Sequence, residues 1–167
     1  QRVTMISYWN EILAAVAAQL SSIQGLPPVQ RRKRSLQWPA VGIKRVVGLW
    51  AVSDEYGPNK TFIGSDGRRV VTILYTIGIS ILIQADEVFE SDAEDPDFLT
   101  LEWREQIRQL FDRPAGNDAA PALPGAPTVY QTDVDLGPVY DEGALNRAYN
   151  ESRLTLICES WEPATGP

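Results

Sequence analysis

One long stretch of alternating residues, from Arg69 to Asp86, constrains the fold of this chain more than any other part of its sequence. Every second residue in it is large and apolar or aromatic, while the residues between are mixed; the apolar set is Val71, Ile73, Tyr75, Ile77, Ile79, Ile81 and Ile83. A period of two predicts a β-strand with one buried face, and β-branched residues favour a strand over a helix. Because this strand exceeds the usual length of roughly 5–6 residues, we expect a bend or bulge, and Gly78 is the expected place.

A transmembrane helix is the competing interpretation of this apolar run. Polar residues interrupt it at Thr72, Thr76, Ser80 and Gln84. The run also falls short of the roughly 20 uninterrupted apolar residues that a span needs. We therefore predict a strand and no membrane partner.

Two segments predict amphipathic helices that cover the strand. Residues 4–24 carry an apolar stripe at spacings of three and four, with Thr4 or Ser7 as the cap and Gly25 as the stop. Asp95 followed by Pro96 predicts the start of a second helix, ending near residue 112. Its expected buried stripe is Leu99, Trp103, Ile107, Leu110 and Phe111, and its expected solvent face is Glu102, Arg104, Glu105, Arg108 and Gln109.

Further strands are predicted at residues 41–52, 128–135 and 152–161. The polar residues 53–68 join the first of these to the central strand as a long β-hairpin, with Phe62 and Ile63 at its tip. The predicted fold class is therefore α+β: a central, mostly antiparallel sheet with a long β-hairpin and two amphipathic helices packed on one face.

The chain is predicted to form a single domain over residues 1–167, because its length suits one core. Residues 113–127 are rich in proline, glycine and alanine and predict a long loop. Residues 141–150 are typical of a short helical turn, and residues 162–167 are expected to be a C-terminal tail.

Composition excludes several kinds of chemistry. The chain has no histidine, the commonest general base and zinc ligand, and its net charge of −7 argues against general nucleic-acid binding. Its only cysteine, Cys158, lies in an apolar strand pattern, which predicts a buried inert thiol. The acidic residues 86–97 match no calcium-loop spacing, so a solvated loop is the favoured interpretation. No nucleotide, nucleophile or zinc motif occurs, and we predict no catalytic residue, no cofactor, no metal and no enzyme activity.

Six residues are candidates for contacts with partners. Two prolines precede the basic run, which predicts an exposed segment that is either a solvated loop or a docking arm for an acidic partner or passing DNA. Two apolar residues at the hairpin tip indicate a contact with another chain. The candidates are Arg31, Arg32, Lys33, Arg34, Phe62 and Ile63. The large aromatic residues Trp50, Tyr75, Trp103 and Trp161 are instead expected in the core.

The order of the predicted elements carries a family resemblance. A first helix containing Trp9-Asn10-Glu11-Ile12-Leu13 precedes the long hairpin, and an acidic turn leads into the second helix. The stretch from Tyr140 to Ser152, with an alanine–leucine pair and an aromatic residue, precedes the last strand. This pattern resembles the neck and tail-terminator (head–tail joining) proteins of long-tailed bacteriophages. The loop 113–127 and the basic run 31–34 have no counterpart in it.

The resemblance implies a structural virion protein: a tail-terminator ring, expected to be a hexamer, that caps the tail tube and joins it to the head connector. The implied partners are copies of the chain itself, the tail tube protein and a head-completion or connector protein. DNA would pass through the lumen without sequence-specific binding. The implied location is the virion neck at the top of the tail, and the host cytoplasm during assembly.

Two alternatives stay open at this point. One is a head-closure or tail-tube subunit of the same assembly. The other, from a different class, is a small soluble enzyme or ligand-binding domain. Ring formation favours a joint protein, whereas a stable monomer with a deep apolar pocket favours the ligand-binding domain.

Overall fold

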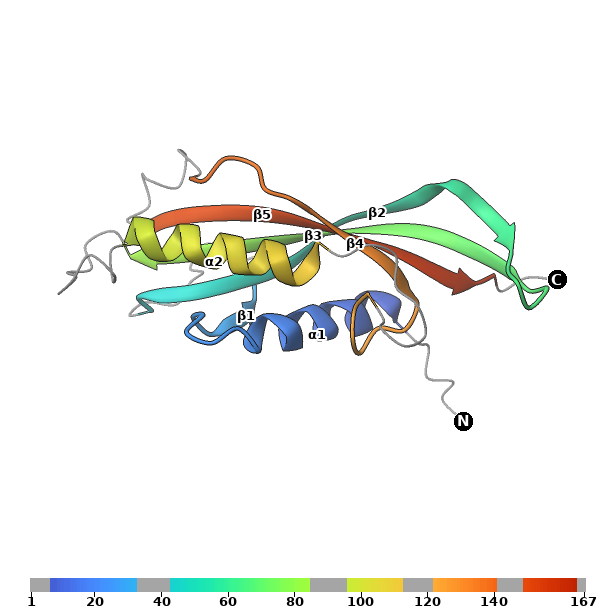
Figure 1. The fold of residues 1–167 in the computed structure, drawn as a ribbon, viewed down its shortest axis with the longest axis horizontal. Helices are drawn as coiled ribbons and strands as arrows, with labels where there is room; N and C mark the ends of the chain where they lie inside the picture. Colours follow the sequence, from blue (N-terminus) through green and yellow to red (C-terminus); the bar gives the residue numbers. More distant parts are fainter. Residues whose placement is uncertain (1–6, 33–42, 85–95, 113–121, 141–148, 165–167) are drawn as a thin grey trace.

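The computed structural model describes residues 7–32, 43–84, 96–112, 122–140 and 149–164, which form a five-stranded sheet and two helices (Figure 1). The strand order is β1-β2-β3-β5-β4. β1 pairs in parallel with β2, and the other neighbouring strands pair antiparallel, so the predicted α+β class is confirmed. The strands are β1 (Val29–Arg31), β2 (Arg45–Ile63), β3 (Arg69–Gln84), β4 (Val129–Asp135) and β5 (Tyr149–Pro163), and the helices are α1 (Tyr8–Ser21) and α2 (Pro96–Phe111).

The predicted central strand is β3, which pairs with β2 on one edge and with β5 on the other. Its alternation sorts side chains between two faces of the sheet. Ile77, Ile79 and Ile83 are fully buried, and they belong to the core cluster that includes both helices. We call this face the helix side. The opposite face, to which Gly78 and Ser80 belong, is called the open side.

The bulge predicted at Gly78 is found elsewhere. Gly78 pairs regularly with Trp50 on β2 and with Thr155 on β5. The nearest irregularity lies in β2, where the register shifts between Ala51 and Ser53. The glycine is required instead because the Trp50 ring lies against it.

Both predicted helices are present and pack on the helix side (Figure 1). Ser7 caps α1, since its side chain accepts a hydrogen bond from the backbone N–H of Asn10. Gly25 follows the helix with a φ of 83°, in the left-handed region that favours glycine. α2 begins at Pro96, as predicted. The core residues of the two helices are Ile12, Leu13, Ala15, Val16 and Leu20 from α1, and Trp103, Ile107 and Phe111 from α2.

One residue of α2 was assigned to the wrong face. Arg104 was expected on the solvent face, but it is only 6% exposed. The true buried stripe runs through Thr100, Arg104, Ile107 and Phe111, beside Trp103. These positions repeat at the helical period of three to four residues. Thr100 and Arg104 therefore belong to one continuous buried stripe with the apolar residues.

Several segments differ from the sequence-based expectation. β2 continues to Ile63 through residues expected to form a polar connection, and β5 extends to Pro163. Leu123 and Ala126, from the expected long loop, are fully buried. Of the four aromatic residues expected in the core, Tyr75 and Trp103 are buried, whereas Trp50 and Trp161 are half-buried on the open side. Of the helical turn expected at residues 141–150, residues 141–148 lie outside the described residues, and Tyr149 and Asn150 belong to β5 instead.

Candidate assembly surfaces

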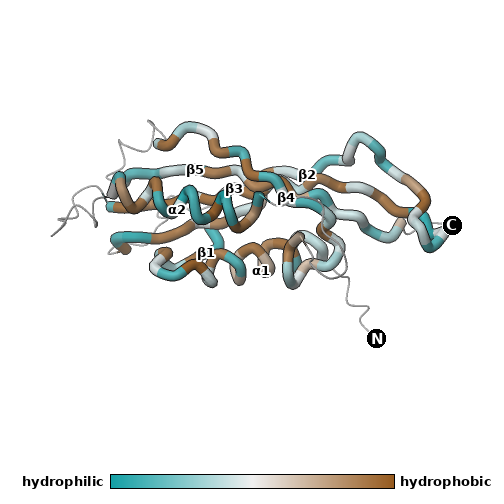
Figure 2. The backbone as a smooth tube through the Cα atoms, in the orientation of Figure 1, coloured by the Kyte–Doolittle hydropathy of each residue, from teal (hydrophilic) through white to brown (hydrophobic). Residues whose placement is uncertain are grey.

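The hairpin of β2 and β3 extends past the two helices and forms one end of the molecule (Figure 1). We call its outer part, Val52–Ile63 of β2 with Arg69–Tyr75 of β3, the hairpin arm. The turn that closes it is tight: the Gly64 N–H donates to the Arg68 carbonyl at 2.8 Å, and Gly67 has a φ of 78°. Figure 2 shows hydrophobic residues recurring along this arm beyond the helices.

The hairpin arm exposes large apolar side chains. Val52, Tyr56 and Ile63 are 53%, 58% and 63% exposed. In the described part of the chain, β1 covers the outer edge of β2 only as far as Leu49. The arm therefore combines exposed apolar side chains with an open strand edge, which is the usual template for pairing with another chain.

The root of the arm is fixed to the body by α1. The Trp9 ring meets the Tyr75 ring edge to face at 4.7 Å, and its Nε1 donates to Asp54 at 3.0 Å. The Tyr75 hydroxyl donates to the buried Glu162 carboxylate at 2.7 Å. Burial, together with that hydrogen bond, raises the pKa of Tyr75 above its ordinary value. The tyrosine thus stays a neutral donor, and these contacts join the root of the arm to α1 and β5.

The two candidate residues of the predicted hairpin tip lie in different surroundings. Phe62 is half-buried and meets Trp161 edge to face at 4.9 Å, and Trp161 stacks on Tyr130 at 3.6 Å. Ile63 is exposed. Both residues belong to β2, immediately before the turn. Phe62 therefore joins the arm to β5 and β4, whereas Ile63 is available for a partner.

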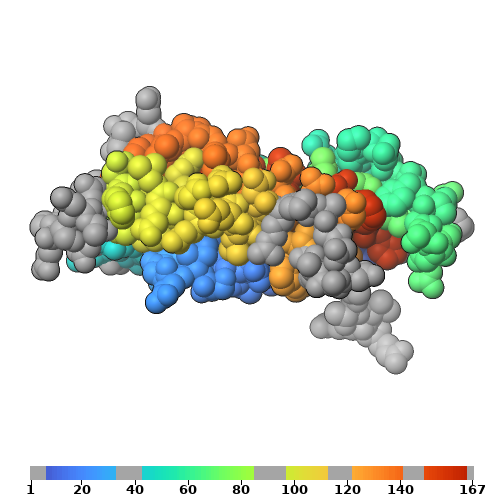
Figure 3. Space-filling view, in the orientation of Figure 1, coloured from blue at the N-terminus to red at the C-terminus, as the bar shows by residue number. Residues whose placement is uncertain are grey.

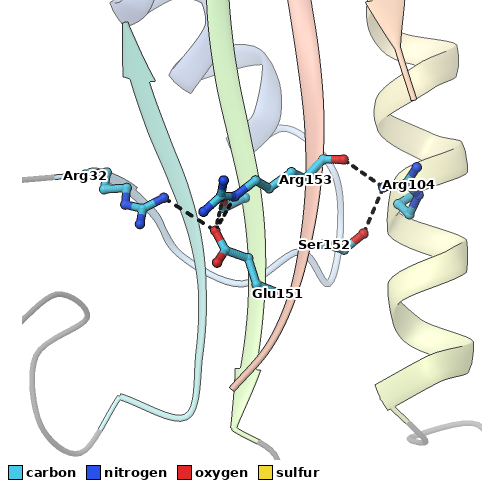
Figure 4. Close-up of polar contacts among 6 residues, drawn as sticks. Arg32, Arg104, Glu151, Ser152 and Arg153 are labelled. Atoms are coloured by element: carbon cyan, nitrogen blue, oxygen red, sulfur yellow. Dashed lines mark hydrogen bonds and ion pairs between the residues drawn. The ribbon is translucent and has the colours of Figure 1, made fainter. Parts of the chain in front are cut away.

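Part of the basic run takes part in a charged cluster on the open side (Figure 4). The Glu151 carboxylate is buried, and it accepts hydrogen bonds from Ser80 at 2.8 Å, Arg153 at 2.8 Å and Arg32 at 3.4 Å. Both guanidinium groups also lie over the Trp50 ring, at 4.9 Å for Arg32 and 5.9 Å for Arg153. The cluster ties the end of β1 to β5 across two intervening strands.

The four basic candidates therefore do not act alike. Arg31 is exposed, at the end of β1. Arg32 is held by Glu151. Lys33 and Arg34 lie outside the described residues. Sequence reasoning missed Glu151 altogether, because nothing in a single carboxylate just before a predicted strand indicates that Arg32, from a distant segment, will meet it.

Arg104 holds α2 to the sheet from the helix side (Figure 4). Its guanidinium donates to the Ser152 hydroxyl at 2.8 Å, the Arg153 carbonyl at 2.9 Å and the Gly137 carbonyl at 3.2 Å, and also to the Leu136 carbonyl. Burial lowers the pKa of Arg104 from its ordinary value. One side chain thereby fixes α2 both to β5 and to the segment that follows β4.

The amino-terminal half of α2 exposes a second apolar surface. Phe98 and Leu101, one helical turn apart, are 55% and 47% exposed, and Leu136 is 40% exposed. Arg104 links Leu136 to the helix, and the Tyr140 hydroxyl lies 2.5 Å from the Asp97 carboxylate. We call Phe98, Leu101 and Leu136 the α2 patch. Figure 3 shows that the outer surface of α2 is open along one face of the molecule.

A shallow groove between α1 and α2 offers little chemistry. Its volume is about 400 Å³, and it is lined by Ile23, Gln24, Gln106, Gln109 and Leu110. None of these lining residues is ionisable, so they supply no general acid or base. Within the described ranges, no three acidic or thiol side chains gather at a metal-binding distance. None of the helices found there is long and apolar enough to cross a membrane.

Comparison with solved structures finds a similar fold. The chain is similar to the sheath/tube terminator, in its extended state, of an extracellular contractile injection system called PVC. The match covers 99% of this chain with a TM-score of 0.55 and 13% sequence identity. The chain spans 59% of the length of that protein. No protein-family model matches the sequence, and no curated protein matches it either.

At this level of identity the similarity is one of fold. It supports the resemblance to tail terminators that the order of elements indicated, at the level of the architecture.

Proposed function

We propose that this chain is a terminator subunit, which assembles with copies of itself into a ring on the end of a tail-like tube and stops the tube from growing. The observation that supports this most directly is the fold match along 99% of the chain to a sheath/tube terminator. A terminator acts by shape and contact, without chemistry at a reacting centre. The proposal therefore fits the absence of ionisable groups from the groove described above.

The shape of the subunit suits a ring. Subunits of a closed ring make heterologous contacts, in which two different surfaces of the same chain meet. This subunit is elongated, with the hairpin arm at one end and the start of α2 at the other (Figure 1). Both ends expose large apolar residues. A hexamer is the ring size that we propose.

The partners follow from that position. We propose that one face of the ring meets the tube protein and that, in a long-tailed phage, the other meets the head connector at the virion neck. DNA then passes through the lumen without sequence-specific contacts. The exposed Arg31, and with it the basic run that continues to Arg34, is proposed to meet an acidic surface on one of these neighbours.

The test is deletion of the gene in the organism that makes the particle, followed by electron microscopy of the tubes. We expect tubes of uncontrolled length, and a return to uniform length when the wild-type gene is supplied in trans. Tubes of normal length on particles that lack heads would instead identify a head-closure protein. Tubes of normal length on complete particles would overturn the proposal.

A second measurement is the mass of the assembled chain. We expect multiples of the 18.5-kDa subunit that close at a fixed number, either in solution or on purified tube ends. A monomer that neither self-associates nor binds tubes would favour a ligand-binding domain.

A further inference from the structure

Two exposed apolar surfaces lie at opposite ends of the long axis of the molecule (Figure 1). One is on the hairpin arm, where Tyr56 and Ile63 are 58% and 63% exposed. The other is the α2 patch, where Phe98 and Leu101 are 55% and 47% exposed. Because they are separated along the length of the sheet, they do not cover each other within one chain. Among the described residues, both surfaces stay exposed.

The charges around the two surfaces are opposite. The end of the arm, residues 60–69, exposes three basic side chains and a single acidic one: Lys60, Arg68 and Arg69 against Asp66. Two further carboxylates, Asp54 and Glu55, are exposed nearer the root of the arm, where Asp54 accepts a hydrogen bond from Trp9. The first ten residues of α2 expose three carboxylates, those of Asp97, Glu102 and Glu105, of which Glu105 is paired with Arg108. Its one basic residue in that stretch, Arg104, is turned inward onto backbone carbonyls. The end of the arm around Ile63 is therefore net basic and the start of α2 is net acidic, as in complementary interfaces.

Complementary charge also decides which contacts are unfavourable. Two arms placed together would bring Lys60, Arg68 and Arg69 of both chains into one interface. Two α2 patches placed together would do the same with carboxylates. Like charges across an interface disfavour both symmetric pairings, so the arm-to-patch contact between two copies is the favoured one.

We propose that the hairpin arm of one copy docks on the α2 patch of the next, with Tyr56 and Ile63 against Phe98 and Leu101. This inference rests on the proposed ring and names the surfaces that close it. The contact is heterologous, since each copy offers its arm to one neighbour and its α2 patch to the other. The open outer edge of β2 lies beside these arm residues, so the docked arm keeps its backbone edge within reach of the neighbour.

The test mixes two variants that are each defective on one side. The arm variant is Tyr56→Asp with Ile63→Asp, and the patch variant is Phe98→Asp with Leu101→Asp. We expect each to be monomeric alone, because every arm-to-patch contact then lacks one surface. An equimolar mixture retains one intact arm and one intact patch, so it should give a heterodimer of two 18.5-kDa chains and nothing larger.

The control is Asn10→Asp, which adds one negative charge at an exposed position of α1, outside both surfaces. It should assemble as the wild type does, and circular dichroism should show all variants folded. A mixture that stays monomeric, or a patch variant that still dimerises by itself, would overturn the arm-to-patch contact.

A covalent readout separates this inference from the proposed function. The double variant Ile63→Cys with Leu101→Cys should form a ladder of cross-linked subunits on oxidation, both in concentrated solution and on purified particles. The native Cys158 is buried and should not contribute. A ladder together with tubes of normal length in the deletion strain would sustain the contact and overturn the terminator. Tubes of uncontrolled length in the deletion strain, without a ladder in either sample, would support the terminator and overturn the arm-to-patch contact.

Discussion

Gly78 on β3 lies directly beneath the indole of Trp50 on β2. A Cβ built at Gly78 would lie 2.3 Å from the Cε2 and Cζ2 atoms of the Trp50 ring, closer than carbon atoms can approach. The same ring has Arg32 on it at 4.9 Å, and Arg32 in turn binds Glu151. Because Gly78 has no side chain, the Trp50 ring can lie close against the β3 backbone. The ring in turn contacts Arg32, which belongs to the charged cluster on the open side.

We predict that Gly78→Ala destabilises the protein by about 1–3 kcal/mol, the usual cost of forcing an extra methyl group into a packed site. Urea unfolding followed by fluorescence measures the change. In a Trp50→Val background the same substitution should cost much less, because the obstructing ring is gone. An equal cost in both backgrounds would show that the glycine is needed for its backbone instead.

A second prediction concerns Arg104, which donates hydrogen bonds to three backbone carbonyls and one hydroxyl. Replacement by methionine keeps the apolar stem but leaves these acceptors without their donor. We expect a loss of about 2–4 kcal/mol of unfolding free energy. The control is Arg108→Met, one turn further along the same helix.

Arg108 is partly exposed and bonds to Glu105 on the helix surface. Surface ion pairs of this kind contribute little, so the control should unfold close to the wild type. Similar losses for both arginines would mean that the buried contacts of Arg104 do not hold α2 in place.

The isoleucines of β3 and Arg104 of α2 show which features of the fold can be predicted from sequence and which cannot. The isoleucines of β3 could be assigned because their period of two repeats over many residues, and repetition is a local signal. Arg104 could not be assigned, because an arginine in a helix has a solvent position as its default. Its burial depends on carbonyls near Gly137 and on Ser152, which are far away in the sequence.

The hairpin illustrates the same limit. Its existence followed from two strands and a turn-rich connection, but its length did not. β2 continues through Asp54 to Ile63 because β3 supplies backbone partners as far as Tyr56 and again from Thr61, on both sides of a register shift. Pairing of this kind stabilises polar residues that no local propensity would place in a strand. The nearest bulge to Gly78 lies in β2, near Val52. The prediction at Gly78 was wrong because a glycine in a strand can mark a close contact as well as a bend.

A third prediction concerns the hydrogen bond at the root of the arm. Tyr75→Phe removes the donor to Glu162, a carboxylate that is only 6% exposed. Leaving a buried acceptor unsatisfied should cost about 1–3 kcal/mol. Tyr56→Phe, an exposed tyrosine on the same hairpin, is the matched control and should leave the unfolding free energy unchanged. Equal stability of the two variants would contradict the anchoring role of Tyr75.

A fourth prediction separates the two described arginines of the basic run. Arg31 is exposed, and Arg32 binds the buried Glu151. We expect Arg31→Glu to weaken attachment to the partner particle, measured by co-sedimentation with purified tubes, with no loss of thermal stability. Arg32→Glu should lower the unfolding temperature, since it places two carboxylates together beneath Trp50. Unimpaired attachment of the Arg31 variant would remove this residue from the docking surface.

The last prediction uses the buried thiol. Burial raises the pKa of Cys158 from an ordinary value of 9.0 to about 12. In the folded protein the thiol therefore stays protonated at pH 8, and a disulfide reagent should label it only as fast as the protein unfolds.

Between pH 9 and about 12 the unfolded chain has lost the thiol proton while the folded chain retains it. Stability must then fall as pH rises through this window, by about 1 kcal/mol per pH unit. Cys158→Ala lacks this titration, and the other groups cancel between the two proteins. The stability difference between wild type and variant should thus be constant below pH 9 and should shift against the wild type above it. Parallel profiles up to pH 11 would show that the thiol ionises freely in the folded state.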